Sequence, residues 1–175
     1  MSDKSIDVSR SLNVELWQLF ENDQADRLGN RKNLDAQEFA KRDAKRLARA
    51  DEIYPERSIL SAESLYCLAM LYQHGSSTVH YERAFELASR SAESGYQEAR
   101  PLSAAAEDRL LLSQGLMQKW GTQFRMETLN GPFEQQPMLS DEESGITDAM
   151  RRDMGVKDRH EQREWLIQTQ HVQLL

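Results

Sequence analysis

Charged side chains interrupt the apolar stripes of several helical segments in this sequence. In the segment 11–28, Asp23 lies seven residues after Leu16, on the same helical face, and Arg27 follows four residues later. A charge that faces a core must be paired and hydrogen-bonded, because its burial otherwise costs several kcal/mol. Paired groups of this kind can also hold an anion or transfer a proton. The spacing therefore predicts an interhelical pocket with polar walls.

The same interruption recurs further along the chain. Asp43 lies seven residues after Ala36, and Asp108 lies four residues after Ala104. His74 ends the most apolar segment. Several segments are thus predicted to deliver polar groups to a common interior. The residues that we expect to line it are Asp23, Gln24, Arg27, Asp43, His74, Asp108, Arg109, Gln118, Thr122 and Gln123.

Two residues of this set are candidates for catalysis. We expect His74 or Asp108 to exchange a proton with the ligand, while the arginines hold its carboxylate or phosphate group. Thr122 and Gln123 add a hydroxyl and an amide that can orient a polar ligand. Gly121 lets the backbone approach that ligand closely.

A structural interpretation of the same residues stays open. A histidine in the last turn of a helix can cap free carbonyl groups, and Asp–Arg pairs can fix the register of neighbouring helices. The segment 121–123 can likewise be a tight turn that caps the preceding helix. A solvent-connected cluster would favour a ligand site, whereas a closed and fully paired cluster would favour a structural network.

No pattern in the sequence predicts a metal or a cofactor. His80, His160 and His171 lack the spacing of metal ligands. The single cysteine, Cys67, allows neither an intramolecular disulfide nor a cysteine-based zinc site. Strings typical of dinucleotide, P-loop and serine-hydrolase sites are missing from the sequence. We therefore expect chemistry that needs neither a metal nor a cofactor.

The composition describes one acidic domain. The 175 residues include 22 Lys and Arg against 29 Asp and Glu, so the formal net charge is −7. The basic run 41–49 is interrupted by Asp43, which argues against nucleic-acid binding. The longest apolar run, 65–72, is too short to cross a membrane, and the N-terminus lacks the apolar region of a secretion signal. We expect a cytoplasmic protein that contacts neither nucleic acid nor membrane.

Helical spacing and capping residues predict an all-α fold, an antiparallel bundle of six or seven helices. The helix starts are indicated by Ser11, Asp35 with Glu38, Ser61, Ser77 or Thr78, Pro101, and Ser140 with Glu143. The expected segments are 11–28, 36–54, 62–74, 78–94, 101–114, 141–154 and 157–171. Three regions follow: a flexible N-terminus (1–10), a helical domain with the polar pocket (11–138) and C-terminal helices (139–175).

The segment 116–138 breaks the helical pattern. Asn130 and Gly131 are a strong hairpin signal, although Pro132 removes a ladder donor from the second arm. We expect an ordered loop with a short two-stranded hairpin. The last helix has one strong apolar cluster, 165–167, and is the part that we expect to contact a protein partner.

The middle of the chain resembles a Sel1-type repeat, a helix pair related to the tetratricopeptide class. The residues that carry this likeness are Leu68, Ala69, Tyr72 and Gly75, followed by Ala84, Leu87, Ala88, Ala92, Gly95 and Ala99. The alanines allow two helices to approach closely, and each glycine ends a helix. One copy is visible, whereas solenoids need about three stacked units. The likeness implies an antiparallel helix pair and does not, alone, establish a peptide-binding array.

Four short motifs also resemble a bacterial family of unknown function. They are DQxxR at 23–27, QH at 73–74, DR at 108–109 and GxxQxYGTQ at 115–123. The likeness spans about residues 20–124. It implies that members of the family share, as a set, the polar residues that interrupt the apolar stripes here. It implies no reaction. Trp120 stands where the family has Tyr, Gly75 follows the QH pair where a small residue such as Ala is common, and the chain after Phe124 matches poorly.

Two functions follow from these observations. The first is a small cytoplasmic protein with an interhelical polar pocket, either a metal-free acid/base enzyme of hydrolase or lyase type or a binder of a small anionic metabolite, with or without catalysis. The alternative is a non-catalytic, Sel1-like interaction module whose Asp/Arg/His network is structural. The sequence leaves open whether the protein is an enzyme.

Overall fold

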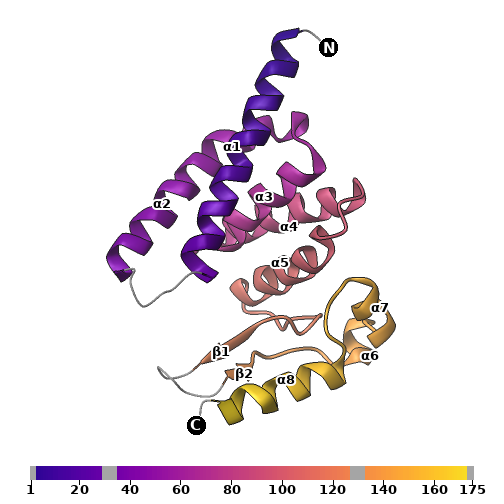
Figure 1. Ribbon diagram of the computed structural model, residues 1–175. Helices are drawn as coiled ribbons and strands as arrows, with labels where there is room; N and C mark the ends of the chain where they lie inside the picture. The colour runs from indigo at the N-terminus through magenta and orange to yellow at the C-terminus, as the bar shows by residue number, and fades with distance from the viewer. Residues whose placement is uncertain (1–2, 29–34, 127–132, 173–175) are drawn as a thin grey trace.

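The computed structural model describes residues 3–28, 35–126 and 133–172 of the chain and shows a predominantly helical fold (Figure 1). Its elements are α1 (Asp3–Leu28), α2 (Ala36–Ile53), the 3-10 helix η2 (Tyr54–Ile59), α3 (Ala62–Gln73), α4 (Thr78–Glu93), α5 (Ala99–Ser113), β1 (Phe124–Met126), β2 (Phe133–Gln135), α6 (Asp141–Ser144), α7 (Asp148–Asp153) and α8 (Arg159–Val172). The predicted all-α bundle is confirmed. None of the helices within these residues is long and apolar enough to cross a membrane.

The helix α3 is the centre of the main core. Leu68 and Tyr72 of α3 are fully buried, as are Leu87 and Ala88 of α4. A short turn, 74–77, joins the two helices, which makes them antiparallel neighbours. The helix pair expected from the sequence is therefore present, and its likeness to a Sel1 repeat stays a prediction.

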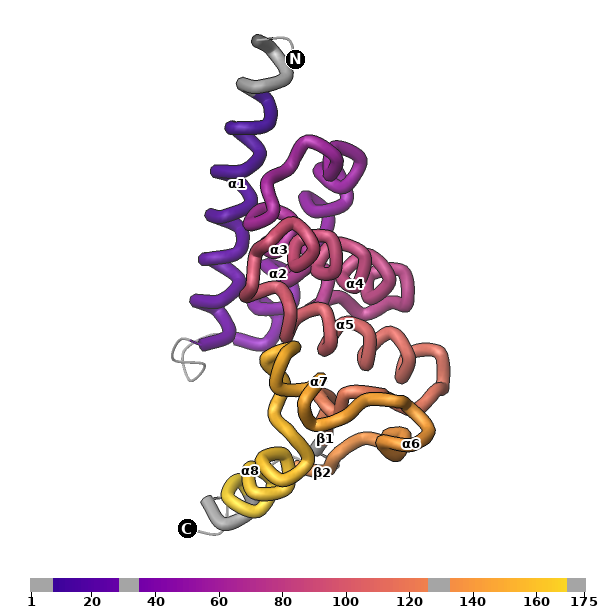
Figure 2. Tube along the Cα trace, turned by 90° about the vertical axis from the view of Figure 1, so that its right-hand side faces the viewer, coloured from indigo at the N-terminus to yellow at the C-terminus, as the bar shows by residue number. Residues whose placement is uncertain are grey.

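The other elements are arranged around this pair. The helices α1 and α2 pack against α3, and α5 packs against α4. The hairpin β1–β2 lies between α5 and α8, at the opposite end of the molecule from the start of α1 (Figures 1 and 2). A second, smaller apolar cluster of Ala104, Trp120, Ile146 and Val156 joins α5 to the C-terminal elements.

Three of the six predicted helix starts are confirmed by side-chain caps. The hydroxyls of Ser61 and Ser77 accept hydrogen bonds from the backbone N–H of Ser64 and His80. Ser140 forms a complete capping box with Glu143. Asp35 is the N-cap residue of α2, but its side chain makes no capping bond, so that part of the expected capping pair was wrong.

The helix start expected at Ser11 was wrong, because residues 3–10, expected to be a flexible N-terminus, belong to the first helix. The helix α1 begins at Asp3, well before the expected start at Ser11. No Pro or Gly occurs in this stretch to end a helix. Ser9 also donates a hydrogen bond to the carbonyl of Ile59, at 2.7 Å, which ties this part of α1 to the end of η2.

The single helix expected at 141–154 was also wrong, because α6 ends at Ser144 and α7 begins at Asp148. Gly145 adopts a left-handed conformation, with φ of 70°, and closes α6. Thr147 then caps the start of α7 by accepting from Met150 N–H. Two local signals therefore divide what the sequence pattern presented as one helix.

The hairpin expected within 116–138 is confirmed as an antiparallel pair in which Arg125 faces Glu134. Gln118 and Met138 form an additional isolated bridge. The turn expected at Asn130 and Gly131 lies outside the described residues.

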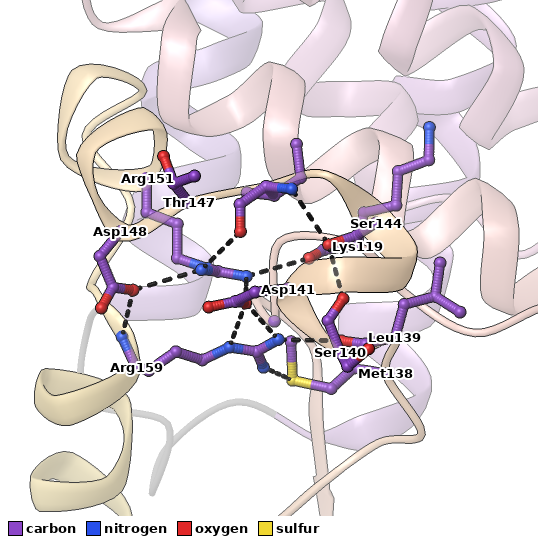
Figure 3. A network of polar contacts seen from close by, with 12 residues as sticks. Lys119, Met138, Leu139, Ser140, Asp141, Ser144, Thr147, Asp148, Arg151 and Arg159 are labelled. Atoms are coloured by element: carbon purple, nitrogen blue, oxygen red, sulfur yellow. Dashed lines mark hydrogen bonds and ion pairs between the residues drawn. The ribbon is translucent and has the colours of Figure 1, made fainter.

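Arg151 ties the C-terminal elements to the loop that follows α5 (Figure 3). Its side chain is 0% exposed and lies between Asp141, at 2.9 Å, and Asp148, at 3.2 Å. The guanidinium also donates to the carbonyl oxygens of Trp120 and Ile146, at 3.3 and 3.1 Å. One buried cation thus joins α6, α7 and the loop through both charge and backbone bonds.

The only cysteine of the chain is enclosed by the main core. Cys67 is fully buried on α3, and burial raises the pKa of its thiol to about 12. Because the thiolate is the reactive form, we expect a disulfide reagent to label the native protein at least about a hundredfold more slowly than the urea-unfolded protein at pH 8. Spectrophotometric titration with Ellman's reagent measures both rates. Rapid labelling of the native protein would contradict the assigned burial.

Candidate functional site

An acid–base pair lies where the end of α1 meets the end of α3. Asp23 is almost fully buried on α1, and His74 is the C-cap residue of α3. The Nδ1 atom of His74 lies 2.9 Å from Oδ2 of Asp23. The amide of Gln24 donates to the same carboxylate oxygen, at 2.9 Å, and Arg27 Nε lies 3.1 Å from Oδ1. The sequence prediction that these four side chains meet is therefore supported by direct contacts.

Ion pairs extend this cluster from α1 to α2. Arg27 Nη2 lies 2.8 Å from Asp43 Oδ2, and Arg46 Nη2 lies 2.5 Å from Asp43 Oδ1. Arg46 also pairs with Asp26, at 2.7 Å. These contacts hold two antiparallel helices in one register. Asp43 therefore has a structural role, independent of any role in ligand binding.

Asp23 remains ionised in this cluster. Burial alone would raise its pKa, but the nearby His74 imidazole and the charges of Arg27 and Arg46 outweigh burial and leave the pKa below its ordinary value. A carboxylate at Nδ1 favours the histidine tautomer that carries its proton there. The His74 side chain is 21% exposed, and its Nδ1 lies close to Asp23 without the alignment of a hydrogen bond.

The lowered pKa of Asp23 predicts a loss of stability in acid. The unfolded chain binds a proton at this group below about pH 4, whereas the folded state does so only at lower pH. The contribution is therefore complete at neutral pH and is lost as the pH falls through the folded pKa. We expect the free energy of unfolding, from urea titrations, to decrease between about pH 5 and pH 3. The decrease should be shallower in Asp23→Asn, and parallel curves for the two proteins would contradict this origin.

Asp108, the second predicted catalytic residue, holds a loop. It is fully buried on α5, and its Oδ1 accepts from the backbone N–H of Lys119 and Trp120, at 2.7 and 2.9 Å. Its Oδ2 accepts from the backbone N–H and the hydroxyl of Thr122, at 2.9 and 2.8 Å. Each oxygen thus has two donors within the protein, an arrangement that suits an anchor better than a proton shuttle.

Gln118 has a similar bracing role. It is fully buried, its Oε1 accepts from Gln123 N–H at 2.9 Å, and its Nε2 donates to the carbonyls of Gln123 and Gln136. Its amide group is therefore used inside the loop and the hairpin.

Arg109 connects this loop to the end of α3. Its Nε donates to Gln123 Oε1, at 3.1 Å, and its Nη1 donates to the carbonyl of Gln73, the residue before His74. Burial and the charge of Arg27 lower the pKa of Arg109 and outweigh the opposite effect of Tyr81. No carboxylate within the described residues forms an ion pair with this guanidinium.

The amide of Gln73 adds an unused acceptor near the same junction. Its side chain is 5% exposed, and its buried Oε1 accepts no hydrogen bond from the residues that the structure describes. Buried polar atoms normally have partners, so an atom without one marks a place where a further donor would be favourable.

The predicted residues thus fall into two groups. Asp23, Gln24, Arg27, Asp43 and His74 meet at α1, α2 and α3. Asp108, Arg109, Gln118, Thr122 and Gln123 meet around the loop after α5. The groups are linked through the bond from Arg109 to the Gln73 carbonyl. His74 and Asp108 contact different partners rather than each other.

The residues of these networks that were not among the predicted site residues include Asp26, Arg46, Gln73 and Arg151. Asp26 lies three residues after Asp23, a spacing that could have revealed it as part of the same face. Arg151 had no such signal, because α7 is too short to show an apolar stripe.

The hollows on the surface of the described residues include three that lie elsewhere. One, of about 420 Å³, lies between α1 and α2 and is lined by Asp26, Arg42, Lys45 and Arg46 among others. Two lie beside α8, with volumes of about 370 and 580 Å³. Thr122 lines the smaller of these two, whereas His74, Asp23 and Arg109 line none of the three. No group of three or more His, Cys, Asp or Glu side chains in the described part of the chain could hold a metal ion.

Comparisons with protein-family models, curated proteins and solved structures find no match to this chain. The resemblance to a bacterial family therefore rests on the four motifs, and the function must be argued from the geometry.

Proposed function

We propose that this protein binds a small anionic molecule where α1, α3 and α5 meet. The observation that carries the proposal is Arg109, a largely buried guanidinium without a carboxylate partner in the described residues and repelled by Arg27. Its donors reach only neutral acceptors, the Gln73 carbonyl and the Gln123 amide, and a bound carboxylate or phosphate would add the opposite charge that this partly buried cation lacks.

The neighbouring carboxylates are already engaged. Asp43 is shared between Arg27 and Arg46, and Asp26 is shared between Arg42 and Arg46. Asp23 is held by Arg27 and His74. An external anion is therefore the remaining counter-charge for Arg109.

In this proposal His74 supplies the acid–base chemistry. Asp23 orients the ring through Nδ1, and Nε2 takes a proton from the bound molecule or from a water beside it. The arginines hold the anionic group while the proton moves. A metal-free hydrolysis or elimination in the cytoplasm is the reaction class that fits this division of tasks.

The alternative is a non-catalytic helical interaction module. The contacts among Asp26, Asp43 and Arg46 favour it, because they pair the charges between α1 and α2 without any ligand. In that case a protein partner would bind outside this network, with the C-terminal helix as the predicted contact.

Replacing Arg109 separates the two functions. We expect one member of a panel of phosphate, sulfate, citrate and short carboxylic acids to raise the Tm of the wild type at low ionic strength, by mass action. Arg109→Gln should abolish that response while its own Tm stays within a few degrees, because the substitution breaks no ion pair within the described residues. The matched control is Arg57→Gln, which alters a half-buried arginine paired with Glu86.

His74→Gln then tests the acid–base role. It should retain the Tm response to the anion and lose any turnover found with that compound. Failure of every anion to stabilise the wild type, or an unchanged response in Arg109→Gln, would refute the site. A large loss of stability in Arg109→Gln without any ligand response would favour the structural module.

A further inference from the structure

A separate cavity of about 370 Å³ lies between α5, the loop after it and α8. Its lining is mainly apolar or small, with Phe124 and Trp165 as the aromatic members. The two rings lie 4.8 Å apart between centroids and are tilted by 51°, so they present neighbouring faces. A volume of this size is within the range of small-molecule sites.

The polar groups that line the cavity differ in how many hydrogen bonds they already form within the protein. Thr122 is bonded to Asp108 and Gln123, and the Gln162 amide is bonded to Trp120, Lys157 and Gln135. These groups therefore have little hydrogen-bonding capacity left for a ligand.

Lys157 is the exception. Its side chain is exposed at the cavity and forms no ion pair or hydrogen bond with the residues that the structure describes. An ammonium at the edge of an apolar, aromatic cavity favours a molecule with a flat apolar body and one anionic end.

We infer that this cavity binds an aromatic carboxylate, with the ring system beside Phe124 and Trp165 and the carboxylate at Lys157. The site is distinct from the one proposed at Arg109, because its lining includes neither Arg109 nor His74. The two regions share only the loop 121–123, in which Thr122 lines the cavity and Gln123 contacts Arg109.

Naphthalene-2-carboxylate and its neutral amide, naphthalene-2-carboxamide, are suitable probes for isothermal titration calorimetry. We expect the wild type to bind one carboxylate and to bind the amide about three- to tenfold more weakly, the difference that an exposed ion pair provides. Lys157→Gln should bind both probes equally. Lys45→Gln, which alters a lysine at the hollow between α1 and α2, is the matched control and should behave as the wild type.

Two further variants separate the cavity from other binding modes. Ala105→Leu places a larger side chain in the cavity and should abolish binding with the Tm maintained. Arg109→Gln should bind the carboxylate like the wild type, which separates this inference from the proposed function. The inference is overturned if neither probe binds at millimolar concentration, if the amide binds as tightly as the carboxylate, or if Ala105→Leu leaves binding unchanged.

Discussion

Asp108→Ala is expected to lower the free energy of unfolding by about 3–5 kcal/mol, because it leaves several buried donors without an acceptor. Three of these donors are backbone N–H groups, of Lys119, Trp120 and Thr122, and the fourth is the Thr122 hydroxyl. Without this carboxylate the loop must open to water or shift so that the four donors find other acceptors. Urea unfolding followed by circular dichroism measures the change.

Asp108→Asn should give an intermediate loss. It keeps the shape of the side chain but replaces one oxygen by an NH₂ group, which would face a donor instead of accepting from it. The control is Asp153→Ala, which removes an exposed carboxylate whose only described charged partner is Arg100, at 3.3 Å. We expect that change to cost less than about 1 kcal/mol. Equal effects of Asp108→Ala and Asp153→Ala would show that the loop does not depend on Asp108.

Arg151→Ala is the second substitution with a large expected effect, again about 3–5 kcal/mol. It removes a fully buried cation that pairs with Asp141 and Asp148 and donates to the carbonyls of Trp120 and Ile146 (Figure 3). Within the described residues, the two carboxylates then keep only their bonds with Arg159. Arg151→Lys should recover little of this loss, because an ammonium cannot reproduce the planar fork of donors.

Its neighbour provides the control for this prediction. Arg152 is 58% exposed and pairs with Asp158 at 2.8 Å, so Arg152→Ala should cost less than about 1 kcal/mol. Hydrogen exchange locates the effect: Arg151→Ala should lose protection in α6, α7 and the loop 119–122 while α3 and α4 stay protected. Uniform loss of protection, or equal effects of the two substitutions, would contradict the role assigned to Arg151.

Much of the helical arrangement follows from local signals. The caps at Ser61, Ser77 and Ser140 act within a few residues, and the apolar residues of α3 directly predict that this helix is buried. The split between α6 and α7 was harder to predict, because it depends on the left-handed conformation of Gly145 and on the Thr147 cap. Either residue alone is also compatible with a continuous helix.

The candidate site could be predicted less completely. Helical spacing identifies which face of α1 carries Asp23, and the structure places His74 and Arg27 beside it. Spacing could not identify the partners of Asp108, because three of its four donors are backbone N–H groups that any residue type supplies. For the same reason a carboxylate predicted to exchange protons and one that anchors a loop look alike in sequence.

The loop after α5 has a thermodynamic consequence for ligands. Thr122 and Gln123 are consecutive residues, yet one lines the aromatic cavity and the other contacts the guanidinium of Arg109. If a molecule in the cavity displaces this short stretch and so changes the affinity at Arg109 by some factor, an anion at Arg109 must change the affinity of the cavity by the same factor. Titrating each probe in the presence of the other would therefore measure one coupling free energy twice, from opposite directions.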